Sequence, residues 1–267
     1  MHTTPVAGER VVRRLETAGC VAAGEEAAEL LGAAPDRRTL EAWLRRRETG
    51  EPLAWITGTA EFCGRRLHLA PGVYVPRRQS EELARRAAAL LAPGGRALDL
   101  CTGAGAVAAH LVAEVPSATV IGVDLDARAA GCARRNGVRA VVADLDATLR
   151  AGRGVDVVTA VAPYVPTADL RLLPADVQRH EPRLALDGGD DGLDVVRRVV
   201  AAAGRLLRAG GWLLVELGGV QHAALSPALA AAGFARPQAW CDEDGDLRGL
   251  AAQVPPAGRH TRRAPAS

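Results

Sequence analysis

Residues 96–109, RALDLCTGAGAVAA, decide the fold. The stretch predicts a short apolar strand with an acid at Asp99, a turn with two glycines, and a helix that starts near Ala106. Gly103 and Gly105 let the backbone pass close to a ligand, because neither residue carries a Cβ atom. The free N–H groups at the start of the helix point into the same space. We therefore expect a ligand site at this turn.

The spacing of the glycines alone does not identify the ligand. Gly103, Gly105 and Ala108 also fit the dinucleotide fingerprint G-x-G-x-x-G/A. A carboxylate at Asp99 would repel a pyrophosphate docked on the turn, but it suits a cation such as the amino and sulfonium groups of S-adenosylmethionine. The stretch therefore favours a methyl-donor site. Its expected donor-binding residues are Asp99, Thr102, Gly103, Ala104, Gly105 and Ala106.

Strands and helices alternate regularly after this turn. The expected strands lie near residues 119–123, 140–143, 155–161 and 212–217, with weaker candidates near 238–241 and 250–254. The expected helices lie near residues 127–136, 193–207 and 223–232. Such alternation predicts an α/β fold with an open, mostly parallel sheet wrapped by helices.

The composition of the chain changes along its length and predicts four parts. Residues 1–50 repeat apolar positions at helical spacing and predict a small helical domain. Residues 51–78 are interrupted by Pro and Gly and alternate like a hairpin, which predicts a linker. Residues 79–254 form the main domain, and the Pro- and Arg-rich residues 255–267 predict a disordered tail.

Acids end three successive strands of the expected sheet, at Asp99, Asp124 and Asp144. Ligands of such sheets bind outside the carboxyl ends of the strands. Asp124 follows the glycine turn at the interval typical of an acid that binds ribose hydroxyls. Asp144 lies where it could accept a hydrogen bond from an adenine amino group. Each acid alone is also compatible with an ordinary turn, so the prediction depends on all three together.

The fourth strand leads into Val161, Ala162, Pro163 and Tyr164. A proline of fixed φ followed by an aromatic residue predicts a rigid wall over the ligand site. The other interpretation is an ordinary turn with a core tyrosine. Val161 is also an expected contact of the methyl donor.

Composition excludes several classes of function. The net charge of +2 and the lack of a basic run do not indicate a surface for nucleic acid or membranes. The five cysteines and six histidines have no metal-ligand spacing. No apolar run is long enough to span a membrane, and no leader segment is visible at the start. We therefore expect a cytoplasmic protein with reduced thiols, no metal and no membrane partner.

Five stretches of the chain together resemble the release-factor glutamine methyltransferases, the HemK/PrmC group. The matching stretches are EPLAWITG at 51–58, PGVYVPR at 71–77, DLCTGAGA at 99–106, EP at 181–182 with GGDDGL at 188–193, and ELG at 216–218. The glycine turn is common to methyltransferases in general, whereas PGVYVPR and the DGL stretch are more specific.

The resemblance implies a seven-stranded Rossmann-like fold that uses S-adenosylmethionine, preceded by a helical substrate-recognition domain and a hairpin linker. It also implies methyl transfer to the N5 nitrogen of a glutamine in a protein, such as a peptide chain release factor or a ribosomal protein. The catalytic residues that it implies are Val161, Ala162, Pro163 and Tyr164. Oligomeric state is not implied.

The chain departs from the family at the motif Asn-Pro-Pro-Tyr. Val161 replaces the Asn that holds the substrate amide in the family, and Ala162 replaces the first Pro. A valine cannot make that hydrogen bond, and losing one oriented contact costs about 1–3 kcal/mol. The linker motif Pro-Arg-Pro-Glu-Thr-Glu is also changed, to PRRQSE at residues 76–81.

Three alternatives to glutamine methylation follow. The same fold could methylate a nucleic-acid base amine or a small molecule. A catalytically degenerate homologue could bind S-adenosylmethionine or a partner protein without turnover, and Val161 is its best support. A nicotinamide dehydrogenase is the fourth interpretation, and Asp99 argues against it.

Overall fold

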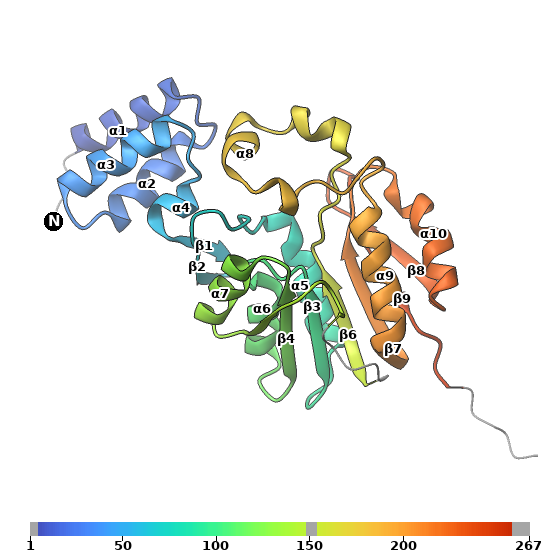
Figure 1. Cartoon of the computed structure of the whole chain (residues 1–267). Helices are drawn as coiled ribbons and strands as arrows, with labels where there is room; N and C mark the ends of the chain where they lie inside the picture. The colour runs from blue at the N-terminus through green and yellow to red at the C-terminus, as the bar shows by residue number, and fades with distance from the viewer. Residues whose placement is uncertain (1–4, 148–153, 258–267) are drawn as a thin grey trace, which may run out of the picture.

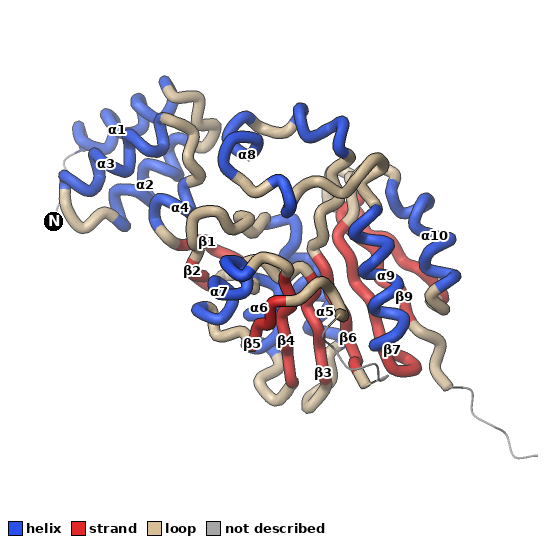
Figure 2. Tube along the Cα trace, in the orientation of Figure 1, coloured by secondary structure: helices blue, strands red, loops and turns tan. Residues whose placement is uncertain are grey.

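A seven-stranded sheet forms the centre of the molecule (Figures 1 and 2). The structure is a computed structural model, and it describes residues 5–147 and 154–257. The strands lie side by side in the order β5-β4-β3-β6-β7-β9-β8. Their bounds are β3 Arg96–Leu100, β4 Thr119–Asp124, β5 Arg139–Val142, β6 Val155–Ala160, β7 Leu207–Glu216, β8 Ala235–Cys241 and β9 Leu247–Gln253.

The sheet is mostly parallel, as the sequence predicts. The neighbours from β5 to β7 pair in parallel, whereas β9 runs antiparallel to both β7 and β8. β3 and β6 lie next to each other at the centre although four elements separate them in the chain. This crossing brings the carboxyl ends of β3, β4 and β6 to one edge, which is where a ligand of such a sheet binds.

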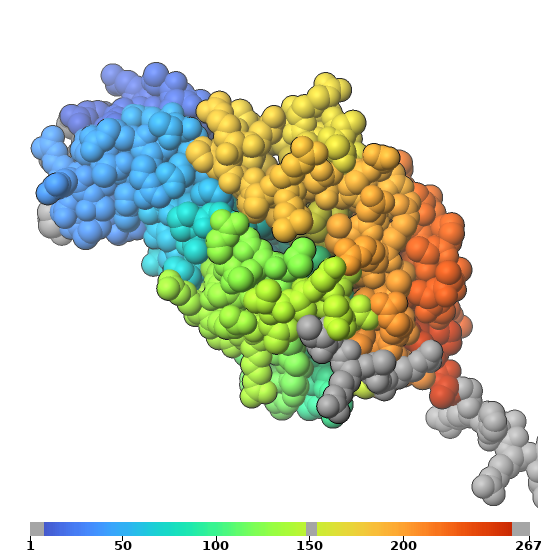
Figure 3. Space-filling model, viewed as in Figure 1, coloured from blue at the N-terminus to red at the C-terminus, as the bar shows by residue number. Residues whose placement is uncertain are grey.

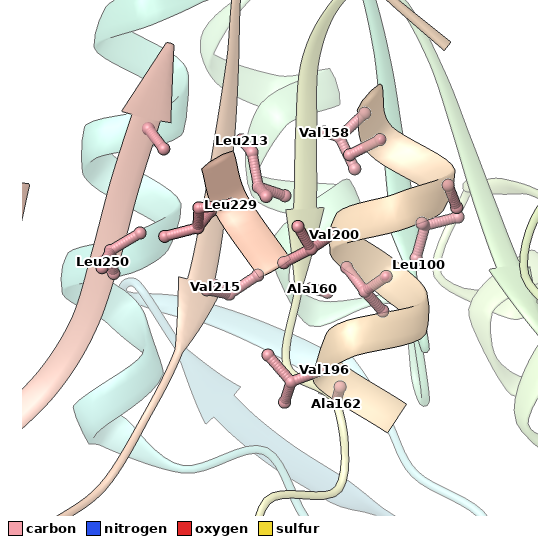
Figure 4. Packing of buried hydrophobic residues seen from close by; sticks show 14 of the residues in the cluster. Leu100, Val158, Ala160, Ala162, Val196, Val200, Leu213, Val215, Leu229 and Leu250 are labelled. Carbon is pink, nitrogen blue, oxygen red and sulfur yellow. The ribbon is translucent and has the colours of Figure 1, made fainter. Parts of the chain in front are cut away.

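Helices cover both faces of the sheet. α5 (Glu81–Leu90), α6 (Ala106–Glu114) and α7 (Ala127–Arg135) pack on one face, and α9 (Asp194–Leu206) and α10 (Gln221–Ala231) pack on the other. Successive strand residues point to opposite faces: Ala97 packs with the first group and Leu98 with the second. Figure 4 shows the core between the sheet and the helices α9 and α10, where strand residues meet Val196 and Val200 of α9.

The N-terminal helices form a separate core. They are α1 (Pro5–Thr17), α2 (Ala23–Ala33), α3 (Arg37–Glu48) and α4 (Leu53–Thr57). Leu15, Leu30 and Leu44 are fully buried between them. α3 begins at a capped end, since the Asp36 carboxylate accepts a hydrogen bond from the Thr39 N–H at 2.7 Å. The sequence did not predict α4, which starts after Pro52 because proline is tolerated at a helix start.

Two connections complete the fold. The predicted hairpin is present as β1 (Thr59–Phe62) and β2 (Arg65–His68), joined antiparallel and followed by the short helix η1 (Arg78–Ser80). Between β6 and α9 the chain forms η2 (Thr167–Leu172), α8 (Ala175–His180) and η3 (Arg183–Ala185), which the sequence did not predict. Figure 3 shows this segment, in yellow, beside the N-terminal helices, in blue.

Three further expectations concern the start of β7, the C-terminal tail and membrane-spanning segments. β7 starts at Leu207, five residues before the predicted start at 212, because α9 ends at Leu206. Most of the predicted disordered tail, residues 258–267, lies outside the described residues. Among the described helices, none combines the length and the apolar character that a membrane crossing requires.

Candidate functional site

The turn needs a glycine at both positions, but for different structural reasons. Both have positive φ, +56° at Gly103 and +80° at Gly105. A Cβ atom at Gly105 would lie 2.9 Å from the Cβ of Ala133 in α7, so this glycine allows the turn to pack on the helix. A Cβ atom at Gly103 would meet nothing within 4 Å. Gly103 therefore faces open space, as expected for a residue that a ligand approaches.

Asp99 is buried beside this turn, with only 2% of its surface exposed. One carboxylate oxygen accepts from the Thr102 hydroxyl at 2.6 Å, and the other accepts from the Thr159 hydroxyl at 2.8 Å. Burial raises the pKa of Asp99 to about 6, although the two hydroxyls favour the charged form. A bound cation would stabilise the carboxylate further, so this position fits a positively charged ligand group.

Asp124 holds the turn in place. One of its oxygens accepts from the Gly103 N–H at 2.8 Å, and the other accepts from the Asp126 N–H at 2.9 Å. Burial raises the pKa of Asp124. Each oxygen keeps a second acceptor position, so the carboxylate could also bind hydroxyl groups, as expected for a ribose.

Asp144 lies in the same region but has a partner that the sequence did not reveal. Both of its oxygens accept from Nη2 of Arg198 in α9, at 2.7 and 2.8 Å. The pair is about half exposed. An adenine amino group would therefore share Asp144 with Arg198.

A cavity of about 140 Å³, which we call the sheet-edge cavity, lies beside Gly103, Asp124 and Asp144. Its polar lining includes Asp124, Asp144 and the backbone of Gly103. Its apolar lining includes Leu125 and Leu184, which are 54% and 59% exposed. Two acids beside apolar side chains suit an adenosine, because the faces of its flat ring pack on apolar side chains while its amino group and ribose hydroxyls donate hydrogen bonds to acids. The lining therefore fits the adenosyl part of S-adenosylmethionine.

A second, small cavity of about 30 Å³ also lies at the turn. We call it the small cavity. It is lined by Asp99, Thr102 and Gly103, and by Ser80 at the start of α5. The Ser80 hydroxyl is buried and has no hydrogen-bond partner among the described residues.

Val161 lies where three spaces in the structure meet. It lines the sheet-edge cavity, the small cavity and a third space of about 840 Å³, which we call the open cleft. The open cleft lies between the N-terminal helices, the segment that contains α8, and the end of β6. Ala162 and Tyr164 line the open cleft, and Pro163 lines the sheet-edge cavity. The predicted wall residues thus separate a ligand cavity from a wide opening.

Tyr164 is fixed by neighbours that the sequence analysis did not assign to the site. Its hydroxyl donates to Oε1 of Glu216 at 2.9 Å and accepts from Nε2 of Gln79 at 2.8 Å. Gln79 also donates to the same Glu216 oxygen at 3.0 Å. Burial raises the pKa of Tyr164, so the phenol stays neutral. The side-chain amide of Gln221 donates a hydrogen bond to the Tyr164 carbonyl at 2.8 Å, so the backbone at Tyr164 is held as well.

Asn136 is another residue that the sequence did not indicate. Its amide nitrogen donates to the Ala104 carbonyl at 2.8 Å and to the His68 carbonyl at 2.9 Å. Its amide oxygen accepts from the His68 N–H at 2.7 Å. One side chain therefore ties the glycine turn to the hairpin.

The loop 71–77 closes the site from the linker side. Gly72 and Tyr74 line the sheet-edge cavity, and the Trp55 indole holds this loop by donating to the Val73 carbonyl at 2.9 Å. Arg77 lies over the Tyr74 ring, 5.0 Å from its centre, and pairs with the buried Glu181. Residues of three matched stretches, 51–58, 71–77 and 181–182, therefore meet at this loop.

Comparison with known proteins supports this arrangement. A family model described as "Methyltransferase domain" matches residues 97–180. The ribosomal protein L11 methylase of Lactobacillus delbrueckii subsp. bulgaricus has a similar fold, with a TM-score of 0.51 and 16% identity. That alignment covers 70% of this chain and 84% of the methylase. The predicted methyltransferase fold is confirmed.

Three relatives define the family. A release factor glutamine methyltransferase of Geobacter sulfurreducens is 41% identical over 66% of this chain, although the chain spans only 63% of that protein. A 4-amino-L-phenylalanine/4-methylamino-L-phenylalanine methyltransferase of Streptomyces pristinaespiralis is 43% identical over 70% of this chain and 68% of its own length. A release factor glutamine methyltransferase of Cereibacter sphaeroides is 35% identical over 92% of this chain and 96% of its own length. The chain therefore belongs to the release factor glutamine methyltransferase family.

Proposed function

We propose that this protein binds S-adenosylmethionine in the sheet-edge and small cavities and methylates a glutamine side-chain amide of a protein, such as a peptide chain release factor. The observation that carries the proposal is the position of Val161, which lines both of these cavities and the open cleft. A donor on one side and an acceptor on the other would meet at this residue. The release factor methyltransferases among the relatives support the choice of acceptor.

Each donor-binding residue has a role that its contacts support. Asp99 would hold the positive end of the donor, and Asp124 would accept hydrogen bonds from the ribose while it holds the Gly103 N–H. Gly103 leaves the space that the donor occupies. When bound, S-adenosylmethionine supplies a methyl carbon that forms a bond to the acceptor nitrogen as the carbon–sulfur bond breaks, and the nitrogen then loses a proton.

On the acceptor side, the residues would promote the reaction by positioning the substrate amide. An amide nitrogen is a weak nucleophile, so the rate depends on holding it close to the methyl carbon in the correct orientation. The size of the open cleft, about 840 Å³, suits a protein segment rather than a single side chain. The rigid Pro163 and the fixed Tyr164 would confine the amide, while Val161 offers it no hydrogen bond.

The direct test is methyl transfer from labelled S-adenosylmethionine to purified release factors and ribosomal proteins, with mass spectrometry to locate the methyl group. Methylation of a glutamine in one of these proteins is the expected result. Donor binding without transfer to any of them would refute the assignment of the acceptor.

A small aromatic amine is the second candidate acceptor. The apolar Val161 favours it, because an aromatic ring gains more from an apolar wall than an amide does. The relative from Streptomyces pristinaespiralis has a name that describes such a substrate. The same assay with 4-amino-L-phenylalanine separates the two: methylation of the amino acid but of no protein would select this candidate.

A further inference from the structure

Glu216 is a buried carboxylate that lies behind the wall of the open cleft. It is the last residue of β7 and is 1% exposed. Its Oε1 accepts two hydrogen bonds, from the Tyr164 hydroxyl at 2.9 Å and from Nε2 of Gln79 at 3.0 Å. Its Oε2 is buried and has no hydrogen-bond partner among the described residues. A buried carboxylate with one unpaired oxygen costs stability, so its presence here needs an explanation.

Gln79 contacts the same hydroxyl from another element. Its Nε2 donates to the Tyr164 oxygen at 2.8 Å as well as to Glu216. Its Oε1 lies on the other side, 3.5 Å from Nη1 of Arg248. The reversed amide would place its oxygen against the Glu216 carboxylate and its N–H groups against the Arg248 guanidinium, so the neighbours fix the orientation of the amide. The hydrogen bonds therefore run in one direction, from Gln79 to Tyr164 and from Tyr164 to Glu216.

The three side chains come from separate parts of the chain that meet at the open cleft. Gln79 lies in η1, Tyr164 follows β6, and Glu216 ends β7. Gln79 and Tyr164 line the open cleft, whereas Glu216 is not among the described residues that line any of the three spaces. A tyrosine side chain has two rotatable bonds, so partners that hold its hydroxyl also hold the plane of its ring. The pair thus restrains the ring that faces the open cleft.

We propose that Glu216 and Gln79 are positioning residues for methyl transfer, because they hold the Tyr164 hydroxyl while Tyr164 confines the acceptor nitrogen in the open cleft. This inference rests on the proposed function and applies to a glutamine amide and to an aromatic amine. Transfer to a weak nucleophile depends on orientation, so a mobile Tyr164 ring lowers kcat. The described linings of the sheet-edge and small cavities include none of these three residues, so donor affinity should not depend on them.

Methyl-transfer kinetics of the full chain test the proposal, with a release factor or 4-amino-L-phenylalanine as acceptor, whichever the assay above selects. Glu216→Met and Gln79→Met keep an unbranched side chain and remove the hydrogen bonds. We expect each to lower kcat about 10-fold, as for a lost hydrogen bond to a charged group. Calorimetry should find their affinity for S-adenosylhomocysteine within about 2-fold of the wild type.

The Tyr164→Phe background shows whether the two residues act through the hydroxyl. Phenylalanine has no hydroxyl to hold, so Glu216→Met or Gln79→Met added to Tyr164→Phe should lower kcat by less than about 2-fold further. Glu216→Gln keeps an oxygen that can accept from the phenol and should retain most of the activity. Gln238→Met removes an exposed amide in β8 and should leave kcat unchanged. If Glu216→Met does not fold, Gln79→Met provides the same test.

An NMR measurement reports on the hydroxyl without any acceptor. The chain has two tyrosines, so protein labelled with carbon-13 at tyrosine Cζ gives two signals. Tyr74→Phe identifies the signal of Tyr164. We expect Glu216→Met and Gln79→Met to shift this signal, because each removes a hydrogen bond to the phenol oxygen or from its proton. Gln238→Met should leave it in place.

Three results would overturn the inference while the proposed function stands. One is an unchanged kcat of Glu216→Met or of Gln79→Met. Another is a further 10-fold loss when either change is added to Tyr164→Phe, because the residue would then act without the hydroxyl. The third is a loss of S-adenosylhomocysteine affinity as large as the loss of kcat, which would indicate a general distortion. Wild-type protein that methylates neither acceptor would instead refute the proposed function, and this inference with it.

Discussion

Alanine substitution at Gly103 and at Gly105 should separate ligand binding from folding. Both residues have positive φ, so either alanine costs about 1 kcal/mol of backbone strain. At Gly103 the new methyl group meets no protein atom within 4 Å and enters the open space in which we propose that the donor binds. At Gly105 it meets the Ala133 Cβ at 2.9 Å and the Val138 side chain at 3.1 Å.

The stability effects follow from these distances. Overpacking a core costs about 1–3 kcal/mol, so Gly105→Ala should lower the free energy of unfolding by about 2–4 kcal/mol in total. Gly103→Ala should lower it by about 1 kcal/mol. In a domain of this size 1 kcal/mol corresponds to roughly 2–4 °C, so we expect losses of about 4–16 °C for Gly105→Ala and about 2–4 °C for Gly103→Ala.

The binding effects should run in the opposite order. Gly103→Ala should weaken S-adenosylhomocysteine by about 10-fold or more, because the methyl group occupies space that the ligand needs. Gly105→Ala, measured well below its melting temperature, should weaken it less. Thermal unfolding and calorimetry on the same samples provide both readouts. If Gly103→Ala binds like the wild type, or if Gly105→Ala is as stable as Gly103→Ala, the reasoning from the turn geometry is refuted.

Three further predictions concern other parts of the site. Val161→Asn should raise glutamine methylation of a release factor, measured by mass spectrometry, because it supplies a hydrogen bond to the amide; no gain would argue for a different acceptor. Asp99 has a pKa raised from 3.8 to about 6, so the folded state binds the extra proton and the free energy of unfolding should fall, on the order of 3 kcal/mol in all, as pH rises from about 4 to 6. Chemical denaturation should find this slope smaller in Asp99→Asn than in the wild type, with a remainder from Asp124, whose pKa burial also raises; an unchanged slope would place its cause elsewhere. Asn136→Ala should lower the free energy of unfolding by about 2–3 kcal/mol, because it removes three hydrogen bonds that join His68 and Ala104; a melting temperature like that of the wild type would contradict the role of this link.

The sheet was predictable because its strands are short apolar runs that alternate with helical patterns. The carboxyl-end acids and the glycine turn then follow from the topology alone. α4 and α8 were missed because they are short and follow Pro52 and Pro174, and an internal proline looks like a break until its place at a helix start is known.

The contacts within the site were less predictable than its location. Arg198 pairs with Asp144 across 54 residues of chain, and Gln79 contacts Glu216 across 137. No periodicity or local motif indicates which polar side chains will meet at such separations. Ser80 illustrates the limit further, because its hydroxyl is buried without a hydrogen-bond partner among the described residues, which only a three-dimensional arrangement can reveal.

The position of β9 has a consequence for biosynthesis. β9 is the last of the described strands to leave the ribosome, yet it lies inside the sheet and pairs with β7 on one side and β8 on the other. Until it is made, β7 exposes an unpaired backbone edge and β8 has no neighbour in the sheet. Stop codons upstream of 247 should therefore yield chains that aggregate or are degraded, whereas a stop codon directly after the end of β9 at Gln253 leaves the strand pairing in place.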